Sequence, residues 1–379
     1  MADLPPRVAL VYDRVNKWGG AERVLLALHE LFPQAPLFTA VYDSSLAPWA
    51  QVFPQVIPSF LQKFPGAKSN HELYPWLTPL AFESLKFDNF DLVISVTSAD
   101  AKGIITKPST FHLCYCLTPT RYLWSHEVLY RDQVSNIASP LFNYLKSWDK
   151  IASTRPDAYV AISQTVKDRI DAFYHRDSTV VYPPTDADAF AQEYSPPTIQ
   201  DYFLWVGRLV AYKRAELVVE TFNKLQLPLV VVGLGKLAQK LQRIARKNIY
   251  LVGHQSEEEL TRYYQHAKAL IFFHEEDYGI VPVEAMAAGT PVIGLNRGGV
   301  SETVVHGITG YLVGDSPDEL KNAILNFDRS HFDRQQIRAH AQKFSKVRFK
   351  KEFTRTLIRL NLGRRRGDPA VAPIARALP

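Results

Sequence analysis

The sequence predicts an α/β protein made of two doubly wound, parallel-sheet domains. The chain has 379 residues, more than a single hydrophobic core usually supports, which indicates two domains. Short runs rich in Val, Ile and Leu alternate with helical patterns, as is typical of parallel strands joined by helical crossovers. The alternation stops at a polar, proline-containing stretch and then starts again, so the same architecture is expected twice.

Each half of the chain contains five predicted buried strands. In the first half they cover residues 8–12, 92–96, 111–115, 159–162 and 180–182. In the second half they cover residues 202–206, 229–232, 249–252, 270–273 and 292–294. Most are followed by glycine or polar residues and then by a helical segment, which is the expected order of a strand, a turn and a helix.

The predicted domain boundary follows from composition. The stretch from Thr185 to Gln200 is polar and contains Ser195-Pro196-Pro197, so it is the expected interdomain linker. We therefore expect an N-terminal domain over residues 1–192 and a C-terminal domain over residues 193–343. Because parallel sheets bind ligands at the carboxyl ends of their strands, the substrate site is expected between the two domains.

Residues 344–379 form the expected terminal segment. Phe349, Phe353 and Leu357 recur every four residues among lysines and arginines, which predicts an amphipathic basic helix. This helix is expected to return to the first domain, with a membrane-facing role as the alternative, and a flexible Pro/Ala-rich tail is expected after it.

Composition excludes several classes of protein. No apolar run approaches the roughly 18 residues that span a bilayer, and the N-terminus lacks the apolar core of a secretory signal. We expect a cytoplasmic protein, with peripheral contact with an anionic membrane as an option.

Lys plus Arg exceed Asp plus Glu by 44 − 38 = 6, which suits phosphate-bearing substrates. No nucleic-acid-binding motif is present, and Cys114 and Cys116 are expected to be buried thiols rather than metal ligands.

A glycine pair, Gly19-Gly20, separates the first predicted strand from a helix. Such a pair lets a backbone approach closely and directs helix N-terminal amides at an anion, which suits a diphosphate. An ordinary turn is the alternative. The second half opens with Gly207, Arg208 and Lys213, whose two cations can converge on one anionic ligand. Each cation could instead be a solvated surface charge.

The most informative segment runs from Phe272 to Pro291. A strand leads into acidic residues, a glycine turn and a helix, with Glu276 and Glu284 eight residues apart. Two spaced carboxylates suggest recognition of hydroxyl groups, and amides at residues 279–281 are available at the helix N-terminus. The alternative is that the acidic residues only complement the helix dipole.

Together these motifs resemble the retaining glycosyltransferases of family 4. The resemblance rests on Gly19-Gly20-Ala21-Glu22, on Gly207-Arg208 with Lys213, and on Glu276 with Glu284 in EDYGIVPVEAMAAGTPVI, and it covers nearly the whole chain in order. It implies the GT-B fold, in which two Rossmann-like domains face each other, and a metal-independent hexosyltransferase without a cofactor. The acidic Asp186-Ala187-Asp188 is interpreted as a linker or capping element, not a metal motif.

The resemblance also implies roles for individual residues. Arg208, Lys213 and Glu276 would be catalytic, the cations by binding the departing diphosphate and the carboxylate by holding the transferred sugar. The implied donor-binding residues are Gly19, Gly20, Gly207, Val252, His254, Tyr278, Gly279, Ile280, Val281 and Glu284. The acceptor-side candidates are Glu22, Leu117, Thr118, Arg121 and Tyr122.

One position departs from the family pattern. In the family that the sequence resembles, the position of Leu117 is usually a His that lies beside the transferred sugar, whereas leucine can neither hydrogen-bond nor titrate. Either His112 or His126 substitutes for it, or the acceptor differs, or activity has been lost. An aromatic and basic stretch over residues 58–87 is suited to an amphipathic acceptor or a membrane interface, with core packing as the alternative.

The expected function is transfer of a hexose, with mannose favoured, from GDP-mannose or a UDP-sugar to a glycan or lipid-linked acceptor in polysaccharide assembly. The alternative from another class is a catalytically impaired protein that binds nucleotide sugar or scaffolds a partner. A GT-B phosphorylase or a nucleotide-sugar epimerase is a further enzyme alternative. The motifs do not fix the base or the sugar.

Overall fold

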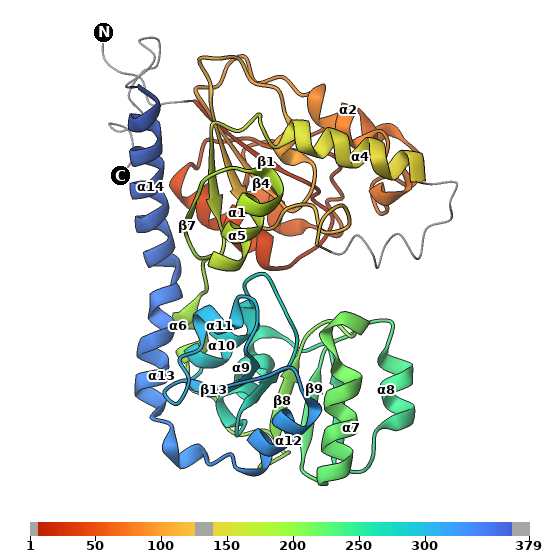
Figure 1. The fold of residues 1–379 in the computed structure, drawn as a ribbon, viewed down its shortest axis with the longest axis vertical. Helices are drawn as coiled ribbons and strands as arrows, with labels where there is room; N and C mark the ends of the chain where they lie inside the picture. Colours follow the sequence, from red (N-terminus) through yellow and green to blue (C-terminus); the bar gives the residue numbers. More distant parts are fainter. Residues whose placement is uncertain (1–6, 126–138, 366–379) are drawn as a thin grey trace. The chain divides into compact units, whose positions relative to one another are not determined.

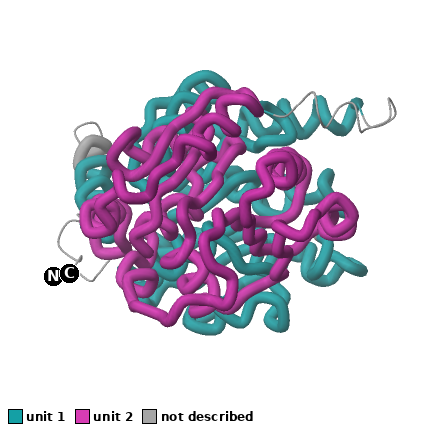
Figure 2. Tube along the Cα trace, turned by 90° about the horizontal axis from the view of Figure 1, so that it is seen from below, with its two compact units in different colours: residues 1–183, 349–379 teal, residues 184–348 magenta. Residues whose placement is uncertain are grey.

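The computed structural model describes residues 7–125 and 139–365, and the chain divides into two compact units (Figures 1 and 2). Unit 1 contains residues 1–183 and 349–379, and unit 2 contains residues 184–348. The whole stretch expected to be a linker, residues 185–200, therefore belongs to unit 2, and part of it forms helix α6 (Ala187–Ala191). Burial explains this difference, because Phe190 on α6 is fully buried and packs against Tyr264.

The described part of unit 1 contains one parallel sheet of seven strands in the order β3-β2-β1-β4-β5-β6-β7. The strands are β1 (Val8–Tyr12), β2 (Leu37–Thr39), β3 (Val56–Pro58), β4 (Leu92–Thr97), β5 (Phe111–Cys116), β6 (Ala158–Ala161) and β7 (Ser178–Val180). The two central strands β1 and β4 are buried along their whole length, which is why they read as continuous apolar runs. Cys114 and Cys116 are buried free thiols in β5, as predicted.

Unit 2 contains a second parallel sheet, with six described strands in the order β10-β9-β8-β11-β12-β13. The strands are β8 (Phe203–Val206), β9 (Leu229–Val232), β10 (Ile249–Gly253), β11 (Leu270–Phe272), β12 (Val292–Leu295) and β13 (Gly310–Val313). The strand order reverses direction at β8 and β11, which are neighbours. This is the place where open α/β sheets bind ligands, outside the carboxyl ends of the strands.

Helices alternate with the strands and flank both sheets (Figure 1). In unit 1, apart from the C-terminal helix described below, the described α-helices are α1 (Gly20–Leu31), α2 (Thr78–Glu83), α4 (Ser139–Ala152) and α5 (Gln164–Tyr174). In unit 2, besides α6, they are α7 (Ala215–Leu225), α8 (Ala238–Ile244), α9 (Glu257–His266), α10 (Ile280–Ala287), α11 (Val300–Thr303), α12 (Pro317–Leu325) and α13 (Arg334–Ala341). Each unit therefore has its own core of strand and helix side chains.

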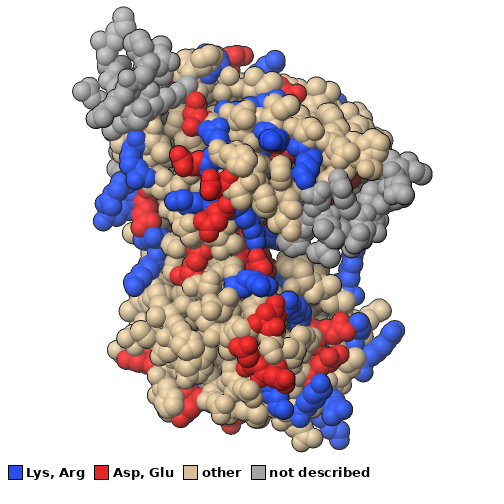
Figure 3. Space-filling view, in the orientation of Figure 1, with Lys and Arg blue, Asp and Glu red and all other residues tan. Residues whose placement is uncertain are grey.

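Helix α14 (Lys346–Arg365) leaves unit 2 and continues along unit 1. Phe349, Phe353 and Leu357 are fully buried, and the first two contact the ring of Tyr115 in β5. Lysine and arginine side chains gather along the outer side of this helix in Figure 3. The apolar stripe of the helix therefore packs on protein. Among the described residues, no helix is both long and apolar enough to cross a membrane.

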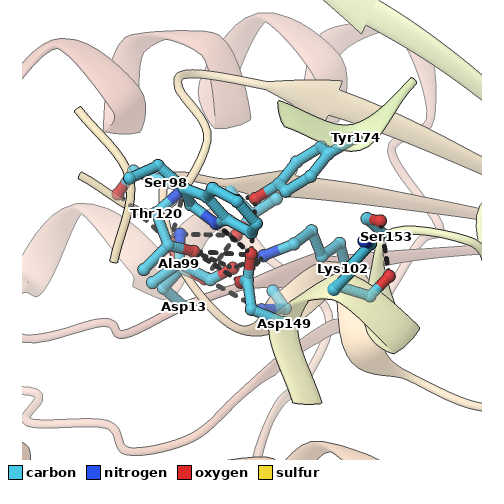
Figure 4. A network of polar contacts seen from close by, with 12 residues as sticks. Asp13, Ser98, Ala99, Lys102, Thr120, Asp149, Ser153 and Tyr174 are labelled. Atoms are coloured by element: carbon cyan, nitrogen blue, oxygen red, sulfur yellow. Dashed lines mark hydrogen bonds and ion pairs between the residues drawn. The ribbon is translucent and has the colours of Figure 1, made fainter. Parts of the chain in front are cut away.

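A buried ion pair organises the carboxyl edge of the sheet in unit 1 (Figure 4). Lys102, in the short helix η4 (Ala101–Gly103) after β4, pairs with Asp149 on α4, and both side chains are almost completely buried. Asp149 also accepts hydrogen bonds from the hydroxyls of Thr120 and Tyr174 and from the indole of Trp124, at 2.7–2.8 Å. These bonds offset the cost of burying the charges and fix the loops that follow β4 and β5.

Two more aspartates lie at the same edge. Asp13, directly after β1, accepts hydrogen bonds from the hydroxyl of Thr97 and the amides of Ser98 and Ala101, so it ties β1 to the loop after β4. Burial raises the pKa of Asp100 to about 7, because desolvation of the carboxylate outweighs the opposing charge of Lys102 and is supported by the charges of Asp13 and Asp149. Asp100 is therefore a carboxyl group that titrates near neutral pH.

Truncating the apolar stripe of α14 tests its packing on unit 1. Phe353→Ala should lower the free energy of unfolding of unit 1 by about 3–5 kcal/mol, because it leaves a cavity beside Tyr115. Lys351→Ala, at an exposed position of the same helix within unit 1, should change it by less than about 0.5 kcal/mol. Hydrogen exchange of the β5 amides under native conditions measures both. Unchanged protection in the Phe353 variant would contradict this packing.

The raised pKa of Asp100 makes unit 1 less stable as pH rises. Between its ordinary value of 3.8 and about 7, the unfolded chain ionises Asp100 while the folded chain keeps it protonated. Asp100→Asn should therefore stabilise unit 1 by up to about 4 kcal/mol at pH 8 and have little effect below pH 4. Thermal melts across pH 4–8 measure this, with Asp88→Asn, at an exposed loop position, as the control. A Tm gain that did not depend on pH would contradict the assignment.

Candidate functional site

The candidate site lies at the carboxyl ends of β8 and β11 in unit 2, which pair in parallel. The loop after β8 contains Gly207 and Arg208 and ends in the short helix η6 (Ala211–Lys213). The loop after β11 runs from Phe273 to Gly279 and leads into α10. Because neighbouring parallel strands end at the same edge, the two loops carrying the predicted catalytic residues lie side by side.

These loops bring two cations to one carboxylate. The ammonium of Lys213 lies 3.1 Å from Oε1 of Glu276, and the two side chains are 11% and 16% exposed. The hydroxyl of Tyr212 donates a 3.4 Å hydrogen bond to the same oxygen, and Arg208 donates a 3.4 Å bond to that hydroxyl. The three predicted catalytic residues thus form one network, linked through a tyrosine that the sequence analysis did not single out. With two cations and one carboxylate, this network can accept a further anion.

Glycines hold the neighbouring loops close together. A Cβ on Gly233, just after β9, would lie 1.9 Å from the carbonyl oxygen of Gly207. Gly298, after β12, has a left-handed φ of 72°, and a Cβ there would lie 2.5 Å from the carbonyl oxygen of Glu276. The amide of Gly299 donates a 2.8 Å hydrogen bond to that oxygen. Glycine is therefore required at Gly233 and Gly298, which place the backbones of the two catalytic loops.

Helix α10 begins beside Glu276. Gly279 is its N-cap, and the chain enters the helix at Ile280 and Val281, whose side chains are half-buried. The first amides of a helix have no partner within it, so this end offers hydrogen-bond donors and a partial positive charge. Tyr278, just before the cap, is buried, and its backbone touches Gly299.

The two glutamates of the motif have different surroundings. Glu276 lies in the loop, whereas Glu284 lies within α10 and is only 3% exposed. Its carboxylate accepts a 3.0 Å hydrogen bond from the hydroxyl of Tyr264 on α9. Their eight-residue spacing therefore separates a partly exposed carboxylate from one that is packed between helices.

Val252 and His254 lie at the end of β10, at the same edge of the sheet as the catalytic loops. One strand, β9, separates β10 from β8. The side chain of His254 is exposed, and the position between them, Gly253, has open space where a Cβ would be. These residues therefore share an edge of the sheet with the Lys213–Glu276 network, with β9 between their strand and β8.

In unit 1, Gly19 and Gly20 lie between β1 and α1. Gly20 is exposed, with open space where a Cβ would be, and it begins the helix. Glu22 is 1% exposed and accepts a 2.7 Å hydrogen bond from the hydroxyl of Tyr12. Its carboxylate also lies against Gly19, where a Cβ would come within 3.2 Å of it. Glu22 thus helps to hold the turn that exposes Gly20.

The other acceptor-side candidates follow β5. The amide of Leu117 donates a 2.8 Å hydrogen bond to Thr97, and its side chain is half-buried. Thr118 is 4% exposed, and its hydroxyl has no hydrogen-bond partner in the described part of the chain. Arg121 and Tyr122 lie in the turn that follows, and Tyr122 is close to the charges of Asp100 and Asp149. The structure thus gathers these four residues in one loop.

His112 does not take the place of the missing histidine. It lies in β5 four residues before its end, roughly 13 Å from the carboxyl edge at the rise of a strand. Its ring is fully buried and bonded to Ser95 at 2.8 Å, and burial lowers its pKa to about 3. The other proposed substitute, His126, and the tail after residue 365 lie outside the described residues.

The acidic segment at residues 186–188 has a structural role. The Asp186 side chain caps the N-terminus of α6 by accepting from the amide of Ala189, and Asp188 accepts from Gln342. This agrees with its interpretation as a capping element. Among the residues that the structure describes, no group of three or more His, Cys, Asp or Glu side chains could hold a metal ion.

Comparison with known proteins identifies the second unit. Residues 186–344 match the family model described as "Glycosyl transferases group 1". The chain is 24% identical over 327 residues to O-antigen chain mannosyltransferase C of Escherichia coli, covering 77% of this chain and 80% of that protein. It is 27% identical over 203 residues to an uncharacterized glycosyltransferase of Methanocaldococcus jannaschii and 29% identical over 203 residues to a D-inositol 3-phosphate glycosyltransferase of Mycolicibacterium smegmatis. These matches cover 52% and 49% of this chain, and 57% and 46% of the relatives.

Solved structures share the fold. Sucrose-phosphate synthase from Thermosynechococcus elongatus has a TM-score of 0.71 at 18% identity, covering 94% of this chain and 100% of that one. HepE of Anabaena, solved in complex with UDP, has a TM-score of 0.66 at 17% identity, covering 93% and 99%. The two parallel-sheet units are therefore the Rossmann-like domains of a GT-B fold, and residues 186–344 form a glycosyltransferase group 1 domain.

Proposed function

We propose that this protein is a glycosyltransferase that moves a hexose from a nucleotide-diphosphate sugar to a hydroxyl group of a glycan or lipid-linked acceptor. The observation that carries the proposal is the network of Arg208, Lys213 and Glu276 at the edge where β8 and β11 meet. Two cations suit a diphosphate, and a carboxylate beside them suits the hydroxyls of the attached sugar.

In this proposal Lys213 and Arg208 bind the diphosphate, and the amides of Gly279, Ile280 and Val281 add donors at the start of α10. As the glycosidic bond breaks, negative charge grows on the leaving phosphate. Fixed cations and amide dipoles directed at that charge stabilise the transition state without reorganising. Glu276 holds the hexose near the reacting carbon by accepting hydrogen bonds from its hydroxyls. No metal ion is required in this scheme.

The remaining donor contacts are assigned by position. Glu284 would hold the ribose, Val252 and His254 would face the base, and Gly20 would approach the phosphates. Mannose is favoured, with GDP-mannose as donor, because the relative with the broadest coverage among those compared is a mannosyltransferase. A UDP-sugar is the alternative donor, since HepE of Anabaena was solved with UDP. Transfer with retention of configuration is proposed from the family resemblance.

The acceptor is proposed to bind at the loop of unit 1 that contains Leu117, Thr118, Arg121 and Tyr122. A cytoplasmic protein in peripheral contact with an anionic membrane is proposed from its basic residues, including the exposed Lys351 and Arg355 of α14. Such contact would give access to a lipid-linked acceptor.

Removing the charge of Lys213 tests donor binding. Lys213→Met keeps the aliphatic stem but loses the ammonium, so affinity for UDP and GDP should fall about 10–100-fold, the worth of one charge-assisted bond. Lys240→Met, at an exposed lysine on α8, is the matched control and should bind normally. Calorimetric titration in EDTA and in Mg²⁺ measures both variants, and equal affinities are expected in the two buffers. Unchanged affinity in the Lys213 variant would remove this residue from the site.

Restoring a histidine at Leu117 separates an active transferase from the catalytically impaired alternative. If the imidazole is the missing sugar contact, Leu117→His should raise donor hydrolysis or transfer at least about tenfold. Leu117→Phe adds a ring without a hydrogen-bonding group and should not raise it. Release of nucleoside diphosphate from GDP-mannose and UDP-glucose measures the rates. Hydrolysis only in the His variant would identify a silenced transferase, and equal wild-type turnover would show that Leu117 is compatible with catalysis.

A further inference from the structure

A buried histidine lies directly beneath the proposed catalytic carboxylate. His274 follows β11 by two residues and is 0% exposed. Neither of its ring nitrogens has a hydrogen-bond partner within the described residues. Its ring lies against Phe272, with the two ring centroids 4.1 Å apart, which fixes its orientation. A buried polar ring without partners is costly, and a partner that the ring acquires in another state of the site would offset that cost.

The ring nitrogen that lies nearest to a charged group is directed at Glu276. Nε2 of His274 lies 3.7 Å from Oε1 of Glu276, just beyond hydrogen-bond distance. The same oxygen is held by Lys213 at 3.1 Å and by Tyr212 at 3.4 Å. Three donors therefore face one carboxylate oxygen, and the histidine is the most distant of them.

His274 is neutral at ordinary pH. Burial, together with the nearby charges of Lys213 and Arg214, lowers its pKa to about 3. A neutral imidazole carries one N–H group, and a carboxylate beside Nε2 favours the tautomer with the proton on that nitrogen. His274 can therefore donate a hydrogen bond to Glu276 without adding a charge to the site.

We propose that His274 is a positioning residue that holds Glu276 when a nucleotide sugar is bound. A diphosphate attracts the ammonium of Lys213, which in this structure is bonded to Glu276. As that ion pair loosens, Nε2–H of His274 donates a hydrogen bond to Oε1 of Glu276. The two atoms need to approach by only a few tenths of an ångström. The other oxygen of Glu276 then faces the hexose hydroxyls. This inference rests on the proposed function and adds a device that couples phosphate binding to sugar recognition.

The proposed role of His274 predicts different effects on the affinities for nucleoside diphosphates and for nucleotide sugars. Nucleoside diphosphates contact the cations but offer no sugar to Glu276, whereas nucleotide sugars need both. Loss of the N–H donor should therefore weaken binding of the sugar nucleotide and leave binding of the diphosphate nearly unchanged. A residue that only filled the core would affect both ligands alike.

The test compares variants with and without a donor at this position. His274→Leu and His274→Phe both remove the hydrogen-bond donor, and the Phe variant keeps an aromatic ring against Phe272. His274→Gln supplies a neutral N–H group in place of the imidazole. His331→Ala, at a histidine that is 65% exposed, is the matched control. Calorimetric titration with UDP, UDP-glucose, GDP and GDP-mannose gives the affinity of each sugar nucleotide relative to its own diphosphate. Thermal melts identify variants that fold.

In the donor-free variants the relative affinity for the sugar nucleotide should fall about tenfold, the worth of one hydrogen bond to a charged group. In the Gln and His331 variants it should stay within about threefold of wild type. Combining His274→Leu or His274→Phe with Glu276→Ala should cause no further loss, because the histidine acts through that carboxylate. Two donor-free variants keep the test valid if one of them does not fold.

The role of His274 would be overturned if the donor-free variants bound sugar nucleotides and diphosphates with equal losses, so that the ratio of the two affinities did not change. A full additional loss in the Glu276→Ala background would overturn it as well. If wild-type protein bound none of the four nucleotides, the proposed function itself would fail, and this inference with it. The two failures are distinguishable, because the first leaves diphosphate binding to the wild type intact.

Discussion

Every strand pairing in the two described sheets is parallel, and this constraint determines where chemistry can occur. Parallel strands leave all the loops at their carboxyl ends on one edge of the sheet, whatever their separation in sequence. Arg208 and Glu276 meet for this reason, although 68 residues (276 − 208) separate them. Asp13, Asp100 and Thr118 are gathered in unit 1 for the same reason.

The two units hold these edges in different ways. Unit 1 uses buried charge, since Lys102 and Asp149 join the loops after β4 and β5 to two helices. Unit 2 uses the absence of side chains, because Gly233 and Gly298 let backbones pack directly against the loops that carry the cations and the carboxylate. A charged network keeps loops in place at the cost of desolvation, whereas glycine contacts leave room at the edge for a ligand.

Much of this could be predicted from the sequence, because it depends on local pattern. The long apolar runs became β1, β4 and β9 within one residue of the expected bounds, and the motif residues Lys213 and Glu276 are in contact. The three-residue strands β2 and β3 were not predicted, because neither contains an apolar run long enough to indicate a buried strand. The roles of His274 and Asp100 could not be predicted. They depend on burial and on the distance to a partner, and the local sequence determines neither of these quantities.

The return of α14 to unit 1 has a consequence for synthesis of the chain on the ribosome. Phe349, Phe353 and Leu357 complete the packing around β5, yet they are translated after the whole of unit 2. Unit 2 is a continuous segment and can therefore fold before α14 is available to complete unit 1. The nascent first unit would therefore expose the apolar surface around Tyr115 until α14 has been synthesised, which favours aggregation and a need for chaperones during that interval.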